Sequence, residues 1–248
     1  MYTDAHIHLY DCFVQNGIEP DSGRQNLLCA SSCRPDEFLW QESYAASRPG
    51  RIFLSFGIHP QDPDESRLEF LAGLVRDRRV QAIGECGFDF YEERFSARKD
   101  EQKRAWDAQV SLAADSGLPL VVHCRKGLPL IFADFRRLKK ISAVVFHGWP
   151  GSANEARSLL SRGINAYFSI GKALLRGDRS AAETVAALPL DRILTETDAP
   201  YMTLRGEKST QPADIEAVAR AAAVIAGTDL SAFVSRIKTN FTTVFRFP

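Results

Sequence analysis

All five histidines of the chain stand at or near the ends of apolar runs, which is where a metal site would need them. His6 and His8 form an H-x-H motif in YTDAHIH, and His59, His123 and His147 close RIFLSFGIH, LPLVVH and ISAVVFH. Residues two apart on a strand point to the same side, so the imidazoles of His6 and His8 can reach one ion. Imidazole is the commonest protein ligand for metals. The histidines therefore predict a metal centre.

Two carboxylates occupy equivalent positions. Glu85 closes VQAIGE and Asp198 follows RILTET. The runs before these residues are rich in Val, Ile, Leu and Phe, a composition that predicts parallel strands buried on both faces. If such strands share one barrel, their carboxyl ends share one rim, and enzyme chemistry on that fold is built at this rim.

This set of ligands is too large for one tetrahedral catalytic ion, which takes about three protein ligands and a water. It is large enough for two ions about 3.5–4 Å apart, between which a water can ionise and act as nucleophile. We predict two divalent ions, with ligands divided as His6, His8 and Asp198 for one, His123 and His147 for the other, and Glu85 for both. Asp198 is the candidate to orient the water or take its proton. The nitrogen-rich set favours zinc, and the carboxylates also permit manganese or magnesium.

Further polar residues near the same strand ends could support the ligands or contact substrate. His59, in GIHP, is a candidate for a ligand, for a contact to the ligands or a substrate phosphate, or for a strand cap. Arg125, Lys172 and Arg205 could each bind a phosphate, or be solvated loop charges. Glu196 is expected to hydrogen-bond a ligand imidazole.

Three neighbours of the predicted ligands are given structural roles. Asp89, in GFDFY, could cap a helix or face the site, and the cap is the favoured interpretation. Cys86 and Cys124 each directly follow a predicted ligand, and we expect them to be buried fillers because the next residue on a strand points the other way.

The apolar runs alternate strictly with amphipathic segments. We predict strands at 3–7, 27–32, 52–57, 80–84, 119–123, 142–146, 164–169 and 193–196. We predict helices at 35–48, 66–78, 97–116, 128–140, 152–162, 179–187, 213–226 and 230–245. This alternation favours a parallel sheet with helices outside. Eight strands in 248 residues fit a single α/β domain, a TIM-like (β/α)8 barrel over 1–248, because such barrels are about 250 residues long.

Composition narrows the functional classes. The net charge of +0 argues against a general nucleic-acid clamp, which would be basic, but a metal can supply positive charge locally. The longest apolar stretches fall short of the roughly 18 residues of a membrane helix, and the start of the chain does not read as a signal peptide. Five scattered cysteines suit reduced thiols. We therefore expect a cytoplasmic protein with no membrane partner and no obligate protein partner.

Several motifs together carry a family resemblance. DAHIHL, GIHP, IGECGFDFY, LPLVVHCRK, FHGWPGS, YFSIGK and ILTETDAPY resemble, in order, the signatures of TatD-related metal-dependent hydrolases, the TatD DNase family of the amidohydrolase superfamily. The resemblance implies a TIM-like barrel, a divalent-metal site and hydrolase activity, commonly that of a DNase. The family's ligand positions match the six ligands proposed above one for one. Two stretches depart from it and border the rim, namely MTLRGEKSTQPADI after TETDAPY and a short segment between the first two strands.

We therefore expect a hydrolase that cleaves phosphodiester bonds in DNA ends or short nucleic acids with a water activated by two metals. A second hypothesis is an esterase, lactonase or amidase acting on a small molecule. Many superfamily relatives of that kind bridge their metals with a modified lysine on strand four, where this chain has Glu85. A third hypothesis is a metal-binding scaffold without catalysis.

Overall fold

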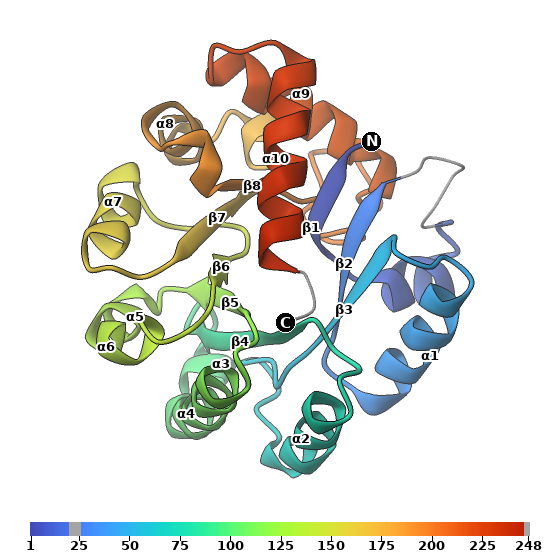
Figure 1. Ribbon diagram of the computed structural model, residues 1–248, viewed down its shortest axis with the longest axis vertical. Helices are drawn as coiled ribbons and strands as arrows, with labels where there is room; N and C mark the ends of the chain where they lie inside the picture. Colours follow the sequence, from blue (N-terminus) through green and yellow to red (C-terminus); the bar gives the residue numbers. More distant parts are fainter. Residues whose placement is uncertain (20–25, 246–248) are drawn as a thin grey trace.

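Eight parallel strands, each paired with the next in chain order, form a nearly closed barrel in the computed structural model, which describes residues 1–19 and 26–245. The strands are β1 (Thr3–Ile7), β2 (Leu27–Ser32), β3 (Ile52–Phe56), β4 (Ala82–Asp89), β5 (Leu120–Arg125), β6 (Val144–Phe146), β7 (Ala166–Ile170) and β8 (Ile193–Thr195). Helices surround them (Figure 1). The predicted TIM-like barrel is confirmed.

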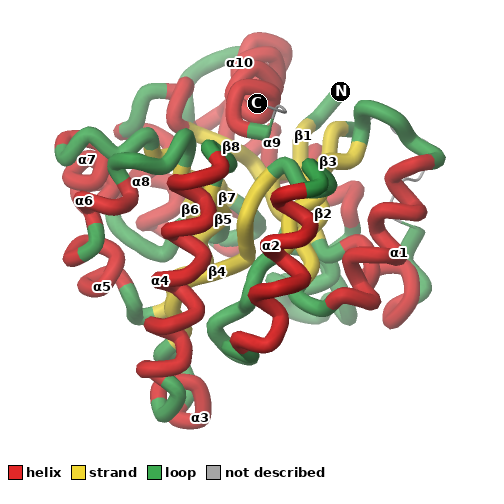
Figure 2. The backbone as a smooth tube through the Cα atoms, turned by 60° about the horizontal axis from the view of Figure 1, so that its bottom comes forward, coloured by secondary structure: helices red, strands yellow, loops and turns green. Residues whose placement is uncertain are grey.

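The helical segments follow the predicted alternation. They are η1 (Asp11–Gln15), α1 (Pro35–Ala46), η2 (Glu65–Arg67), α2 (Leu68–Arg76), α3 (Glu93–Ser96), α4 (Lys99–Ser116), α5 (Leu128–Ala133), α6 (Phe135–Leu138), α7 (Ala153–Ser161), η3 (Leu174–Arg176), α8 (Arg179–Ala187), η4 (Leu190–Arg192), η5 (Pro212–Asp214), α9 (Ile215–Ile225) and α10 (Leu230–Val244). The helix predicted at 128–140 is broken at Asp134, which ends α5 and precedes α6. Figure 2 shows α3 projecting beyond the rest of the fold.

No single helix within the described ranges is long and apolar enough to cross a membrane. The helical segments Pro212–Ile225 and Leu230–Val244 reach that length and apolar character only when taken together, and they are bent by 109° relative to each other. The expected cytoplasmic location stays a prediction.

β4 is longer than the sequence suggested. The prediction ended this strand at residue 84, whereas β4 continues through Glu85 to Asp89, where it pairs with Arg125 of β5. Glycine makes this pairing possible. A Cβ on Gly84 would collide with the carbonyl oxygen of Val121, and one on Gly87 with that of His123. The φ angles of Gly84 and Gly87 are 137° and 138°, in a region of backbone conformation that other residues rarely adopt.

Two layers of apolar packing fix the direction in which the site residues point. Val121, Val145 and Leu194 face the inside of the barrel and belong to a cluster with Phe241 and Phe245. Figure 1 shows α10, which carries Phe241, lying across the barrel. Since side chains alternate along a strand, the residues two positions after these three also point inward, at the other end of the barrel. They are His123, His147 and Glu196.

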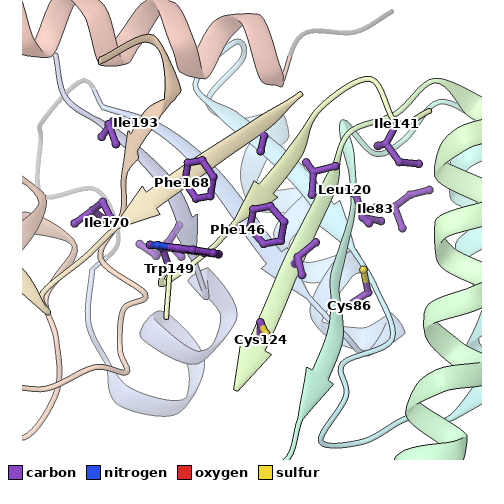
Figure 3. Close-up of a cluster of buried hydrophobic side chains, with 14 of the residues drawn as sticks. Ile83, Cys86, Leu120, Cys124, Ile141, Phe146, Trp149, Phe168, Ile170 and Ile193 are labelled. Atoms are coloured by element: carbon purple, nitrogen blue, oxygen red, sulfur yellow. The ribbon is translucent and has the colours of Figure 1, made fainter. Parts of the chain in front are cut away.

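The alternate residues of the same strands pack outward against the helices. Phe146 and Phe168 stack there with ring centroids 5.7 Å apart. Cys86 and Cys124 belong to this outer layer (Figure 3), and both are free, buried thiols. This confirms the prediction that both cysteines are buried core residues and do not face the site.

The seam between β8 and β1 is closed by residues of the predicted metal site. The backbone N–H of Asp198 donates to the carbonyl of His6 at 3.0 Å, and the N–H of His8 donates to the carbonyl of Ala199 at 2.9 Å. The hydroxyl of Thr195 donates to the carbonyl of Thr3 at 2.9 Å. Barrel closure therefore holds the backbones of three predicted ligands in register.

Two buried glutamines on one face of α4 hold the ends of β3 and β4. Gln109 accepts a hydrogen bond from the N–H of Ile58 at 2.8 Å and donates to its carbonyl at 3.2 Å. Gln102 does the same for Asp89, at 2.9 and 3.0 Å. Buried backbone groups need such partners, and the two amides supply them to Ile58 and Asp89.

We expect Gln109→Ala to lower the free energy of unfolding by about 1–3 kcal/mol, because it leaves the buried N–H and C=O of Ile58 without these partners. Urea denaturation followed by circular dichroism measures the change. Gln15→Ala, at an exposed position, is the matched control and should change stability little. Equal stability of the two variants would contradict this role for Gln109.

Candidate metal centre

A buried carboxylate, that of Glu85, lies at the centre of the site. Its Oε2 is 3.1 Å from Nε2 of His6 and 3.6 Å from Nε2 of His8. Its Oε1 is 2.8 Å from Nδ1 of His123 and 2.9 Å from Nε2 of His147. Each carboxylate oxygen thus faces a different pair of imidazoles.

The side chains predicted as ligands come together in two groups on either side of Glu85. In the first group, Nε2 of His6 and of His8 lie 3.2 Å apart, and Oδ1 of Asp198 is 3.7 and 3.3 Å from them. In the second, Nδ1 of His123 and Nε2 of His147 are 3.2 Å apart. The groups adjoin, since the rings of His6 and His147 stack at 4.1 Å.

A second carboxylate stands behind His123. Nε2 of His123 donates to Oδ2 of Asp89 at 3.1 Å, while Nδ1 of the same ring faces Oε1 of Glu85. Asp89 also accepts from the side-chain amide of Gln61 at 2.8 Å and from the N–H of Tyr91 at 2.9 Å. The helix-cap role predicted for Asp89 is wrong, because the extension of β4 carries this residue to the site, and α3 begins only at Glu93.

His147 and His8 also face carboxylates on the side away from Glu85. Nδ1 of His147 lies 3.6 Å from Oε1 of Glu196, whose position is fixed by the N–H of Gly148 at 2.6 Å. Nδ1 of His8 lies 3.9 Å from Oδ2 of Asp11. Such carboxylates orient an imidazole and raise its basicity. Glu196 therefore lies behind a predicted ligand, as the sequence analysis expected, but at 3.6 Å it makes no hydrogen bond to that imidazole.

His59 approaches Glu85 as a hydrogen-bond donor. Its Nδ1 accepts from the N–H of Gln61 at 3.2 Å, so in the neutral ring the proton is on Nε2. Burial lowers the pKa of His59, which favours the neutral ring. Nε2 lies 3.2 Å from Oε1 of Glu85 and therefore donates to it. A protonated nitrogen cannot ligate a metal, so this geometry favours the supporting role for His59 over the ligand role.

The electrostatics of the cluster call for cations. Burial would raise the pKa of Glu85, but the surrounding imidazoles, His147 above all, hold it well below its usual value. Burial also opposes charge on His8, yet the hydrogen bond with Asp198 and the charge of Glu85 raise its pKa to about 9. Ionised carboxylates buried beside imidazole nitrogens are the usual ligands of divalent metals, so the donor set fits such ions.

The structure corrects the phosphate contact expected of Lys172. The Lys172 side chain is fully buried, and its Nζ donates to Oε2 of Glu207 at 2.6 Å and to Oδ2 of Asp214 at 2.7 Å. Both acids belong to the segment that follows Asp198. The ammonium group therefore anchors that segment and is not available to a phosphate at the rim. The sequence could not reveal this pairing, since its partners lie more than thirty residues away along the chain.

The two arginines predicted to bind phosphate are both exposed. Arg125 ends β5, two residues after His123, and Arg205 lies on the segment after Asp198. Their contact with a phosphate stays a prediction.

Sequence reasoning missed Asp11 and Tyr201. The Tyr201 hydroxyl donates to Oδ2 of Asp11 at 2.8 Å, and its ring meets that of His8 edge-on at 5.1 Å. Asp11 stands three residues after His8 and Tyr201 three after Asp198. That spacing is the signal that could have identified them.

A pocket opens beside Asp198, and its lining includes Gly148, Trp149, Gly171, Lys172, Glu196 and Met202.

A (β/α)8 barrel that gathers imidazoles and carboxylates at the carboxyl ends of its strands has the architecture of a metal-dependent hydrolase. The family model described as TatD related DNase matches residues 3–246, and the chain belongs to this family. The predicted resemblance is therefore confirmed.

Proteins of this family align with the chain over most of its length. A protein of Pantoea vagans named 3'-5' ssDNA/RNA exonuclease TatD is 30% identical over 212 residues, covering 82% of this chain and 81% of its own length. The crystal structure of YJJV, a TatD homologue from Escherichia coli k12, has a TM-score of 0.84 at 22% identity, covering 100% of this chain and 98% of that one. A TatD-family hydrolase from Entamoeba histolytica has a TM-score of 0.81 at 18% identity, with 99% and 98% covered. At these identities the two structures show the fold alone.

We expect manganese or zinc to raise the melting temperature, since a ligand at about 100 times its dissociation constant adds about 2.7 kcal/mol of stability. Glu85→Gln should reduce that rise, because it removes the charge shared by both groups of imidazoles. Differential scanning fluorimetry with and without metal measures both effects. Glu69→Gln, at an exposed position on α2, should respond like the unaltered chain. An equal rise in the Glu85 variant would rule out this carboxylate as a ligand.

Proposed function

We propose that the chain hydrolyses phosphodiester bonds at DNA ends or in short single-stranded nucleic acids, with two divalent cations bound on either side of Glu85. The observation that carries the proposal is the orientation of this carboxylate, which turns one oxygen to His6 and His8 and the other to His123 and His147. The name of the Pantoea vagans relative, an exonuclease on single-stranded DNA and RNA, supports the substrate class.

The ligands divide between the two cations according to the two groups of side chains. His6, His8 and Asp198 would hold one cation, His123 and His147 the other, and Glu85 both. Zinc, manganese and magnesium are all compatible with this mixture of nitrogen and oxygen donors. When bound, such a pair of ions stabilises developing charge on oxygen and provides a nucleophilic water near neutral pH.

Asp198 is proposed to orient the attacking water and take its proton. Burial raises the pKa of this carboxyl, but the hydrogen bond with His8 and the charge of His6 outweigh burial and lower it, so the group is ionised and can accept a proton. Its backbone has a φ of 57°, which aspartate tolerates better than most residues. The N–H bond to His6 described above fixes that turn.

The remaining polar residues position these groups. Asp89, Glu196 and Asp11 orient the imidazoles in front of them, which keeps each ligand nitrogen directed at the centre. His59 donates a hydrogen bond to Glu85 through Nε2 and is proposed to hold that carboxylate in place. Arg125 and Arg205 are proposed as further phosphate contacts at the rim.

The direct test is cleavage of a single-stranded oligonucleotide by the full chain with manganese, zinc or magnesium, and again with EDTA. We expect cleavage with metal and none with EDTA. Asp198→Asn should lower kcat by about 100-fold or more, since a positioned proton acceptor contributes about that much. Asp191→Asn, on an exposed turn at the other end of β8, is the control and should cleave normally. Cleavage that persists in EDTA would reject the metal mechanism.

A second assay separates phosphodiesters from carboxyl esters. Metal centres built from histidines and carboxylates can also hydrolyse acyl bonds. The purified chain is therefore assayed with p-nitrophenyl phosphodiesters and with p-nitrophenyl carboxyl esters. We expect turnover of the phosphodiesters at the higher kcat/KM. A preference for carboxyl esters would favour the esterase, lactonase or amidase hypothesis, and turnover of neither, with metal bound, would favour the scaffold.

A further inference from the structure

An exposed tyrosine lies at the rim of the barrel and is connected to the candidate metal centre through the carboxylate of Asp89. Tyr91 is 61% exposed and follows β4 within two residues. Its N–H donates to Oδ1 of Asp89 at 2.9 Å, while Oδ2 of the same carboxylate accepts from His123 at 3.1 Å. The backbone of Tyr91 is therefore held at the rim by the residue that stands behind a predicted ligand, yet its ring has no part in the mechanism above.

Two cations flank this ring. The guanidinium carbon of Arg125 lies 5.6 Å from the ring centroid and Nζ of Lys126 lies 4.8 Å from it. Nζ of Lys126 also donates to the carbonyl of Tyr91 at 3.5 Å. The nearby acid Glu92 is paired with Arg94 at 2.9 Å. Positive charge and an exposed aromatic ring thus occur together on a chain whose net charge is +0.

From this arrangement we infer that Tyr91, Arg125 and Lys126 form a binding platform for a nucleotide of a single-stranded nucleic acid next to the bond that is cut. The inference rests on the proposed function and adds to it the residues that select single strands. An aromatic ring can stack on a base only when that base is free of its own neighbours, as in a single strand. Arg125 and Lys126 bind the phosphate on the same nucleotide, whose charge they can pair with.

The test compares the full-length chain with Tyr91→Ala and Tyr91→Phe on an oligonucleotide of about ten nucleotides, within the usual range of single-strand sites. We expect Tyr91→Ala to lower kcat/KM by about 5- to 160-fold, the range that stacking on one aromatic ring supplies. Tyr91→Phe keeps the ring and should stay close to the unaltered chain. Arg125→Ala and Lys126→Ala should each weaken binding and make its dependence on salt less steep.

Removal of the base provides the second half of the test. An oligonucleotide with abasic nucleotides at its ends should be a poorer substrate for the unaltered chain, and no poorer than the intact one for Tyr91→Ala, because the stacking partner is then already missing. An equal penalty in both proteins would overturn the platform. So would a Tyr91→Ala loss of equal size on p-nitrophenyl methyl phosphate, which carries no base, since that result assigns Tyr91 a purely structural role.

Binding without turnover distinguishes failure of this inference from failure of the proposed function. Fluorescence anisotropy of a labelled oligonucleotide in EDTA measures the platform when no phosphodiester is cut. Binding that falls in Tyr91→Ala and not in Tyr91→Phe supports the platform even if the chain proves to cleave another bond. Absence of binding by the unaltered chain overturns the platform, whereas the metal-dependent cleavage assay decides the proposed function by itself.

Discussion

The site depends on one buried carboxylate that is surrounded by imidazoles. Glu85 is almost inaccessible to solvent and lies within hydrogen-bonding distance of histidines from β1, β5 and the segments after β3 and β6. A buried charge is costly unless positive groups compensate for it. Here the compensation comes from side chains far apart in the chain, so the site exists only because the barrel closes. Fold and candidate function therefore share a single constraint.

The positions of the ligands are set by groups that are not ligands. Gln102 and Gln109 of α4 bind the backbone at the ends of β4 and β3, and the β8–β1 seam is closed by the backbones of Asp198 and His6. Behind the imidazoles stand further carboxylates, of which Asp89 is the closest to its histidine. Rigid support of this kind keeps reacting groups within the small tolerance that catalysis requires. Lys172 contributes indirectly, by anchoring the segment after Asp198 through Glu207 and Asp214.

Sequence reasoning succeeded where a local pattern decides the outcome. Apolar runs and their alternation with helices predicted the barrel, and the polar residue after each run predicted which side chains meet at the rim. It failed for Asp89 and Lys172, and it missed Asp11, Tyr201 and the two glutamines of α4. Asp89 was misjudged because the extent of β4 depends on its pairing with β5, which two glycines permit. Lys172 was misjudged because its buried carboxylate partners come from a distant segment.

By itself, the sequence determined the order of strands and helices, the family, and the set of imidazoles and carboxylates that could bind cations. These follow from the periodicity of apolar residues and from the chemistry of individual side chains, both of which are local properties. Only the tertiary structure decided which oxygen of Glu85 faces which histidines, which nitrogen of His59 carries the proton, and which charged groups remain exposed at the rim. Those features depend on distances between segments remote in the chain, and such distances are fixed only when the barrel closes.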